Sequence, residues 1–236
     1  MDPSATPRSK RLEQGDRSKE EILDVATRMM SARGYDGTSI SALAKESGLS
    51  ASSIYWHFSS KAGVLSAVME RGSAGFMASS SLADIPANGS RLEKVTAILE
   101  RGAEAVAAHP EFIRLELILL LNAPAGVVDE SVARSRTQER EGLREALAYA
   151  YSDLGSRRAS LVADGLVHFA RATFEGSFLA AQAGTTSAHN VIRQLAQALV
   201  AMADEIIASD TAPSAKSAAA HPRSHQGNGA RRTAVS

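Results

Sequence analysis

No cysteine occurs among the 236 residues of the sequence. This absence excludes disulfide bonds, zinc sites with thiolate ligands, iron–sulfur clusters and a cysteine nucleophile. Net charge is lacking as well, because 26 Lys and Arg balance 26 Asp and Glu, so the overall charge argues neither for nor against a nucleic-acid partner. Aromatic residues are scarce at 5%, whereas Ala, Leu, Glu and Arg are abundant, which favours helices.

Long hydrophobic runs are also missing. The most apolar stretch, 115–121, is interrupted by Glu116 and falls far short of the roughly 18 residues that a membrane span requires. The N-terminal region lacks the apolar segment of a secretory signal. Since 44% of the residues are apolar, the chain can still bury a core. We therefore expect a cytoplasmic protein without a membrane partner.

The two ends of the chain differ in composition from its middle. Residues 1–17 are polar, of mixed charge and interrupted by proline and glycine, so they are predicted to form a flexible arm. Residues 210–236 are rich in Ala, Ser, Pro and Gly and contain one large aliphatic residue, Val235. Such a segment cannot bury enough surface to offset the entropy of ordering, so we interpret it as a disordered tail.

Between these ends the apolar residues recur at helical spacing, with no convincing strand alternation and no internal repeat. The expected fold is all-α with about nine helices, divided into a three-helix domain at 18–66 and a larger helical domain at 67–209. Ser18 and Glu21 have the spacing of a capping box, which predicts that the first helix begins at Ser18. Gly, Pro and Asn breakers place the helices near 18–33, 39–47, 50–58, 60–79, 92–109, 110–121, 129–151, 156–184 and 188–209.

Two short helices joined through Gly48 fit a helix-turn-helix, in which the second helix lies in the major groove of DNA. Hydroxyl groups and free backbone N–H groups at a helix amino end suit a phosphate, because the helix dipole favours an anion there. Serines crowd the two helix starts and the turn: Ser39, Ser41, Ser47, Ser50, Ser52 and Ser53. The core of the small domain is assigned to Val25, Ile40, Leu43, Ile54 and Phe58.

Residues 34–61, GYDGTSISALAKESGLSASSIYWHFSSK, resemble the N-terminal domain of the tetracycline-repressor (TetR) family. The family pattern runs from a glycine through a Thr-Thr-like pair and a turn glycine to Leu-Tyr-x-His-Phe and a lysine three residues on. The corresponding residues here are Thr38, Ser39, Gly48, 54–58 and Lys61. The resemblance implies a homodimer that binds a palindromic double-stranded DNA operator, represses transcription and lets go when a small-molecule effector occupies the second domain.

The resemblance and the crowded helix starts select nine candidate DNA contacts: Thr38, Ser39, Ser50, Ser52, Ser53, Tyr55, Trp56, His57 and Lys61. Tyr55 and Lys61 are expected at phosphates, with a packed tyrosine and a solvated lysine as the alternatives. Trp56 is expected to be exposed near DNA, because a helix does not turn two adjacent residues inward together. His57 is interpreted as a phosphate or backbone ligand, since the spacing shows no partner for a catalytic triad. Residues 1–61 contain nine Lys or Arg and eight Asp or Glu, so a strong basic field is lacking.

The larger domain supplies candidates for a ligand site: Phe112, Leu115, Glu116, Leu119, His168, Phe169 and Phe178, with Phe174 and Arg171 as further candidates. Apolar residues at helical spacing more often form an ordinary core, and that alternative stays open. Glu116 and His168 lie within apolar helices and need partners if they are buried, so internal pairing is the alternative to orienting a ligand.

The end of the chain predicts a dimer interface. Six residues carry this prediction: Ile192, Leu195, Leu199 and Met202 on the last helix, with the small residues Gly176 and Ala180 on the helix before it. The four large residues have the spacing of a coiled coil, and small residues allow close helix approach. One neighbour within the chain would cover one apolar stripe, but the last helix has a second one. We therefore expect a homodimer formed through four helices.

The sequence lacks the phosphate-binding loop, the H-E-x-x-H and G-x-S-x-G motifs and the paired Glu-x-x-His signature, so we predict that the protein is not an enzyme. The favoured hypothesis is a ligand-responsive repressor, released from its operator by a small apolar effector and needing no cofactor or metal. The alternative is an all-helical small-molecule carrier or enzyme without a role in transcription. An architectural DNA-binding protein is disfavoured, because six long helices exceed what a clamp needs.

Overall fold

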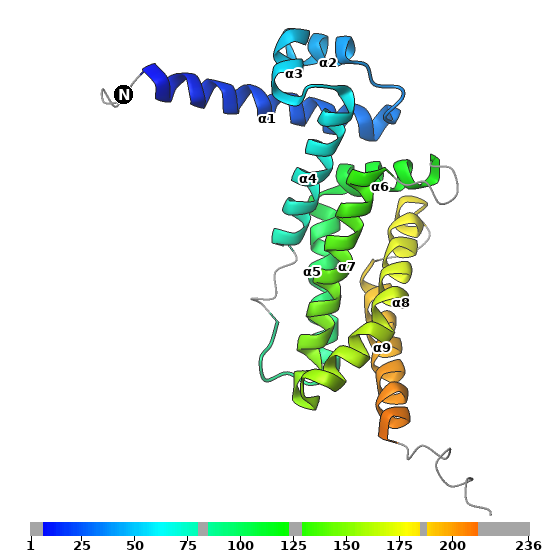
Figure 1. Cartoon of the computed structure of the whole chain (residues 1–236). Helices are drawn as coiled ribbons and strands as arrows, with labels where there is room; N and C mark the ends of the chain where they lie inside the picture. Colours follow the sequence, from blue (N-terminus) through cyan, green and yellow to red (C-terminus); the bar gives the residue numbers. More distant parts are fainter. Residues whose placement is uncertain (1–6, 80–84, 123–128, 185–187, 212–236) are drawn as a thin grey trace, which may run out of the picture.

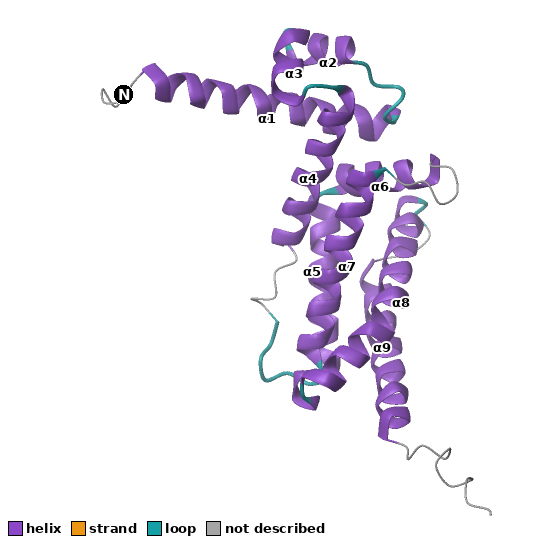
Figure 2. Ribbon diagram, in the orientation of Figure 1, coloured by secondary structure: helices purple, strands orange, loops and turns teal. Residues whose placement is uncertain are grey.

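The computed structural model describes residues 7–79, 85–122, 129–184 and 188–211. Over these residues the chain forms nine α-helices, one short 3-10 helix at Ser152–Leu154 and no strand, which confirms the expected all-α fold (Figure 2). Within these ranges, every helix is too short or too polar to span a membrane. The remaining parts of the predicted arm and tail, 1–6 and 212–236, lie outside the described residues.

Three helices form the N-terminal domain, which we call the headpiece: α1 Pro7–Arg33, α2 Ile40–Ser47 and α3 Ala51–Phe58 (Figure 1). Helix α4, Lys61–Ser79, leads from the headpiece into the larger domain. We call the larger domain the body, and it consists of α5 Arg91–Ala108, α6 Pro110–Asn122, α7 Glu130–Ala150, α8 Ser156–Gln182 and α9 Ala188–Thr211. Within the body α8 packs against α7 and α9, and α9 also packs against α5.

The first helix begins at Pro7 and not at Ser18, so the predicted flexible arm is wrong from Pro7 onward. Ser18 does not cap a helix: its hydroxyl donates to the carbonyl oxygen of Gln14 at 2.9 Å, as in a helix interior. A proline at the first helical position loses no hydrogen bond and has its φ preset, which accounts for the early start. In Figure 1 the N-terminal part of α1 extends away from the rest of the headpiece.

The last helix ends at Thr211, so Asp210 belongs to α9 and not to the predicted tail. The Asp210 carboxylate accepts from Arg157 Nη2 at 2.8 Å and from Arg158 Nε at 3.0 Å, and both arginines lie at the start of α8. These ion pairs join the end of α9 to the start of α8. Composition alone could not indicate them, because the partners are far apart in the sequence.

Two hydrophobic cores hold the helices together. One core joins α5, α7, α8 and α9. The other, which we call the shared core, begins in the headpiece with Ile22 and continues through α4 to Phe112 and Leu115 on α6. The residues assigned to the headpiece core from the sequence lie in it: Val25, Leu43, Ile54 and Phe58 are buried and Ile40 is partly buried. The shared core therefore packs the headpiece against the body.

Candidate nucleic-acid interface and interior cavity

Helices α2 and α3 form the helix-turn-helix that the sequence predicts. Ser39 caps α2, because its side chain accepts from the backbone N–H of Ala42 at 3.1 Å. Ser50 caps α3 in the same way, accepting from the N–H of Ser53 at 3.1 Å. Gly48 ends α2 with a φ of +70°, a left-handed conformation that glycine adopts without strain. Of the serines predicted to contact DNA, Ser39, Ser50 and Ser52 are exposed, and Ser53 is partly buried.

Helix α3 has one buried face and one exposed face. Ile54 and Phe58 pack into the shared core, while Tyr55 and Trp56 are 51% and 77% exposed. The Trp56 ring meets the ring of His57 edge-on, with centroids 4.5 Å apart. The expected exposure of Trp56 is confirmed, and an aromatic side chain this exposed is available to a partner outside the chain.

His57 is partly buried between the rings of Trp56 and Phe58. Burial lowers the pKa of its imidazole and the positive charge of Lys19 lowers it further, while Asp16 opposes the shift. The ring is therefore neutral at pH 7 and offers one N–H donor and one acceptor. This state suits a hydrogen-bonding role rather than a cationic one.

Two of the predicted DNA contacts hold the loop before α2. Thr38 is fully buried, and its hydroxyl donates to the carbonyl oxygen of Gly34 at 3.0 Å. Lys61 Nζ donates to the carbonyl oxygen of Tyr35 at 3.0 Å and lies 4.0 Å from the centroid of the Tyr35 ring. The Thr38 side chain thus has an internal role, which corrects the prediction. Lys61 has a contact within the headpiece that the sequence did not indicate.

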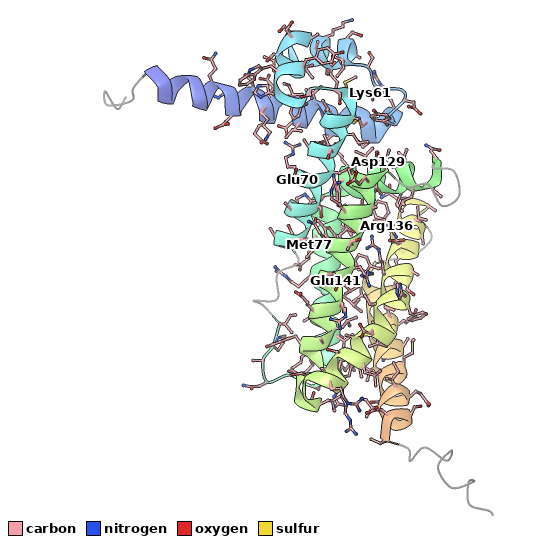
Figure 3. All side chains as sticks on the ribbon, in the orientation of Figure 1. Lys61, Glu70, Met77, Asp129, Arg136 and Glu141 are labelled. Atoms are coloured by element: carbon pink, nitrogen blue, oxygen red, sulfur yellow. The ribbon has the colours of Figure 1, made fainter. Side chains whose placement is uncertain are left out.

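The body contains a cavity of about 220 Å³ between α4, α5, α6, α7 and α8. Its walls are mostly apolar and include Phe76 and Met77 on α4, of which Met77 is labelled in Figure 3, together with Phe174 and Phe178 on α8. Sites for drug-sized ligands span about 300–1,000 Å³, whereas a cavity of about 150 Å³ is large enough for benzene. The cavity therefore has room for a small molecule of intermediate size.

Four residues proposed from the sequence as ligand contacts line this cavity: Glu116, Phe178, Phe174 and Arg171. The other five lie elsewhere: Phe112, Leu115 and Leu119 pack in the shared core, and His168 and Phe169 are exposed on α8. Helix periodicity shows that α6 has an apolar stripe, but it does not show which neighbour that stripe meets. In the structure the stripe faces α1 and α4. The Phe112 ring occupies the space beside Gly72, where any side chain at position 72 would clash with it.

Several charged residues at the cavity are not predicted by the sequence pattern. Arg101, Glu139, Glu145 and Glu175 line the cavity, and Arg136 is paired with Glu116 beside it. A signal was present, because Leu143 and Leu147 mark the buried side of α7 and Glu139 precedes Leu143 by one helical turn. A carboxylate in line with a buried stripe is either paired internally or contacts a ligand.

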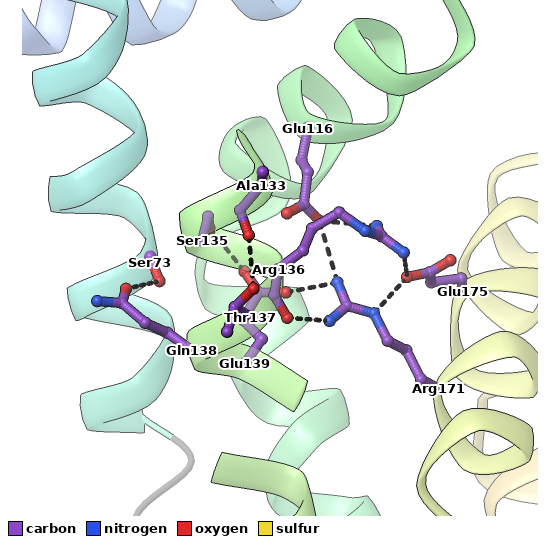
Figure 4. Close-up of polar contacts among 10 residues, drawn as sticks. All are labelled: Ser73, Glu116, Ala133, Ser135, Arg136, Thr137, Gln138, Glu139, Arg171 and Glu175. Atoms are coloured by element: carbon purple, nitrogen blue, oxygen red, sulfur yellow. Dashed lines mark hydrogen bonds and ion pairs between the residues drawn. The ribbon is translucent and has the colours of Figure 1, made fainter. Parts of the chain in front are cut away.

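Two arginines and three glutamates form what we call the ionic cluster at the cavity wall (Figure 4): Arg136, Arg171, Glu116, Glu139 and Glu175. Arg171 donates to Glu139 Oε2 at 2.9 Å and to Glu175 Oε1 at 2.8 Å. Arg136 Nη2 lies 3.0 Å from Glu175 Oε1. Glu116 Oε2 is farther away, at 3.5 Å from Arg136 Nη1 and 3.7 Å from Arg171 Nη2. In the described ranges, no group of three or more His, Asp or Glu is placed to hold a metal ion.

Glu116 is the least well paired member of the ionic cluster. Its side chain is 4% exposed, and its Oε1 has no hydrogen-bond partner among the described residues. Burial and the neighbouring Glu139 carboxylate raise the pKa of Glu116 to about 8, against the opposing effect of Arg171 and Arg136. Burial likewise raises the pKa of Glu139. Glu116 is therefore mostly protonated at pH 7.

Glu116 makes the stability of the protein depend on pH. Its folded-state pKa lies above the ordinary value of 4.5, so the folded protein binds more protons than the unfolded chain between pH 4.5 and about 8. The free energy of unfolding therefore falls as the pH rises through this window. Glu116→Gln cannot ionise, so we expect its unfolding free energy to rise relative to the wild type between pH 6 and pH 8.5, as measured by urea titration.

The same substitution at an exposed position of α6, Glu111→Gln, is the control and should follow the wild-type pH profile. Parallel profiles for the wild type and Glu116→Gln would contradict the raised pKa of Glu116.

The residues predicted for a dimer interface lie mostly inside one protomer: Ile192, Leu195 and Leu199 are buried, Met202 and Ala180 are partly buried, and Gly176 is exposed. The prediction is wrong for the three buried residues, because α9 turns this stripe against α5 and α8. Exposed apolar and small residues instead follow one side of α8. We call this side the outer face of α8, and it consists of Leu161, Phe169, Ala172, Gly176 and Leu179.

Sequence comparisons match the headpiece. Residues 22–68 match the family described as "Bacterial regulatory proteins, tetR family". The HTH-type transcriptional regulator AcrR of Shigella flexneri is 40% identical over 53 residues, which are 22% of this chain and 25% of AcrR. The matched part thus spans about a quarter of that relative.

Solved structures resemble most of the chain. A tetR-family transcriptional regulator from Streptomyces coelicolor has a TM-score of 0.61 and 17% identity, over 82% of this chain and 89% of the other. FadR from Bacillus subtilis, in complex with stearoyl-CoA, has a TM-score of 0.58 and 17% identity, over 78% of this chain and 98% of FadR. At these identities the comparison shows that headpiece and body share the fold of these proteins.

Proposed function

Because the chain belongs to the TetR family of bacterial regulatory proteins, we propose that it is a transcriptional repressor that binds a palindromic DNA operator as a homodimer and is released by a small molecule bound in the body. The observation that carries this proposal is the capped helix-turn-helix, whose second helix exposes Tyr55 and Trp56. The major groove of B-DNA admits a helix of this kind.

Helix α3 presents two kinds of group to the groove. The Tyr55 hydroxyl suits a phosphate, a contact that positions the protein without reading the sequence. Ser52 and Trp56 suit base edges, where a hydroxyl group bonds to several bases and an apolar ring packs against a thymine methyl. The helix has neither Arg nor Lys, so we infer that DNA shape carries part of the specificity.

The outer face of α8 is the proposed dimer contact. Leu161, Phe169 and Leu179 are exposed there, and the position that a side chain of Gly176 would occupy is open. Small residues between large apolar ones let two copies approach closely, which buries apolar surface on both. A twofold axis at this face would place one α3 helix of each copy on the DNA. The two operator half-sites would then lie about one helical turn, or 34–36 Å, apart.

Helix α6 connects the cavity to the headpiece. It places Glu116 and Leu117 at the cavity wall and Phe112 and Leu115 in the shared core. A ligand that shifts α6 therefore also shifts the packing beneath α1, and the spacing of the two α3 helices changes. A coupling of about 1.4 kcal/mol weakens operator binding tenfold and lies within the usual range. The similarly folded FadR forms a complex with stearoyl-CoA, which supports a small-molecule effector for this chain as well.

The roles of α3 can be separated with two variants of the full chain. Tyr55→Phe is expected to weaken DNA binding by a similar factor for every sequence, because it removes a phosphate contact. Trp56→Ala is expected to change the preference at individual base pairs by about 1–3 kcal/mol. Fluorescence anisotropy with DNA from upstream of the protein's own gene, and with single-base variants of it, measures both. Trp56 is the only tryptophan, so its emission also reports binding without a label.

Leu121→Ala is the control, since Leu121 is equally exposed but lies on α6. Wild-type affinity and base preference in the Tyr55→Phe, Trp56→Ala double variant would overturn the placement of α3 in the groove. A wild-type chain that binds small molecules and no DNA would support the carrier alternative instead.

A further inference from the structure

The cavity wall holds a buried acceptor that the chain leaves unused. Glu116 Oε1 has no hydrogen-bond partner within the described part of the chain, and Oε2 lies 3.5 Å and 3.7 Å from its two arginine partners. Figure 4 shows dashed lines from Glu116 to Arg136 and Arg171. Buried polar atoms almost always have a partner, so an unpartnered carboxylate oxygen at a cavity wall indicates a group from outside the chain.

The charges around Glu116 favour a cation over an anion. Glu116 faces Arg136 and Glu139 on α7 and Arg171 and Glu175 on α8, so three carboxylates share two guanidinium groups. Both guanidinium groups make contacts of 3.0 Å or less with Glu139 or Glu175, and Arg136 Nη1, which has no hydrogen-bond partner among the described residues, lies 3.5 Å from Glu116 Oε2. With Glu116 protonated the charges of the cluster are balanced, so an anion would add uncompensated negative charge, whereas a cation can take the place of the Glu116 proton.

The rest of the wall fits the same conclusion. Arg101 on α5 lies 3.5 Å from Glu104, so its charge is offset nearby. The aromatic part of the wall consists of Phe76, Phe174 and Phe178. Aromatic faces attract cations, and more strongly where water is excluded.

We propose that the cavity binds a lipophilic organic cation, with its charged nitrogen beside Glu116 and its apolar part against Phe174 and Phe178. This inference rests on the proposed function and names the chemical class of the effector. A cavity of about 220 Å³ limits the cation to about ten to fifteen non-hydrogen atoms, between benzene and drug-sized ligands. An ammonium ion that carries an N–H group would also donate to Glu116 Oε1.

Binding of such a cation displaces the proton of Glu116. Burial and Glu139 raise the pKa of Glu116 to about 8, so without a neighbouring cation its carboxyl group is mostly protonated at pH 7. A neighbouring positive charge stabilises the carboxylate, and the proton passes to the buffer. One proton is released for each permanent cation bound, and the affinity rises by up to about tenfold per pH unit below pH 8.

The test compares phenyltrimethylammonium with tert-butylbenzene, which has the same shape but carbon in place of the charged nitrogen. Calorimetry with the full chain at pH 7 is expected to show at least tenfold tighter binding of the cation. Glu116→Gln should lose at least tenfold in affinity for the cation and stay within about twofold for tert-butylbenzene, which also shows that its cavity is intact. Buffers of different ionisation enthalpy should report the released proton.

Glu111→Gln, on the exposed side of the same helix, is the matched control and should bind both probes as the wild type does. Tighter binding of tert-butylbenzene, binding of neither probe, or an unchanged cation affinity in Glu116→Gln would each overturn the proposal.

Operator binding separates this inference from the proposed function. If the cation binds through Glu116 and leaves operator affinity unchanged, the ligand class stands and ligand-controlled repression fails. If tert-butylbenzene releases the operator while the cation neither binds nor releases it, the regulator stands and the cation proposal fails.

Discussion

Replacing Leu199 with alanine is expected to lower the free energy of unfolding by about 2–5 kcal/mol, because truncating a buried leucine removes apolar contacts and leaves a cavity. Leu199 is 0% exposed and lies in the core that joins α9 to α5 and α8. Urea titration followed by circular dichroism, at one fixed protein concentration, measures the loss.

The matched control is Leu121→Ala, in which the same side chain is truncated at an exposed position of α6, outside the proposed dimer contact. We expect a cost below about 1 kcal/mol, since this leucine is 78% exposed. Equal costs for the two variants would contradict the placement of Leu199 inside the protomer.

The second large effect concerns assembly. Phe169→Glu combined with Leu179→Glu places two charges on the outer face of α8, where the buried interface of the proposed dimer would have to accommodate them. We expect sedimentation to show a monomer. Operator affinity should fall about 100- to 10,000-fold, because the two headpieces no longer bind DNA as a linked pair.

Leu121→Glu, a charge at an exposed apolar position of α6 outside this face, should leave both the dimer and the operator affinity unchanged. A Phe169→Glu, Leu179→Glu variant that sediments as the wild type would show that the outer face of α8 is not the contact between copies.

The sequence predicted the helices better than it predicted their faces. The turn at Gly48 and the serine caps of α2 and α3 follow from local chemistry, so the helix-turn-helix could be placed to within a residue. The face that α6 turns to the cavity depends instead on α1 and α4, which lie far away in the sequence. Phe112 and Leu115 were therefore assigned to a ligand site, although they fill the shared core.

Two further errors have the same physical origin. The stripe of Ile192, Leu195 and Leu199 is apolar whether its partner is α8 of the same chain or a second copy, so the pattern could not decide between them. Glu139 was overlooked because α7 contains many Arg and Glu, and its burial depends on Arg171 of another helix. A local signal can start a helix, but only the packing of distant segments selects the side that is buried.

The shared core has a consequence for how this chain could be divided. The apolar floor beneath α1 and α4 is completed by Phe112 and Ile113 of α6 and by Val132 of α7, all outside the matched segment 22–68. A fragment that stops after α4 would leave that floor of α1 and α4 open to water and lose part of their apolar burial. Headpiece and body should therefore melt in a single cooperative transition. A chimaera that grafts this DNA-binding segment onto another regulator would need α6 and the start of α7 to close this floor.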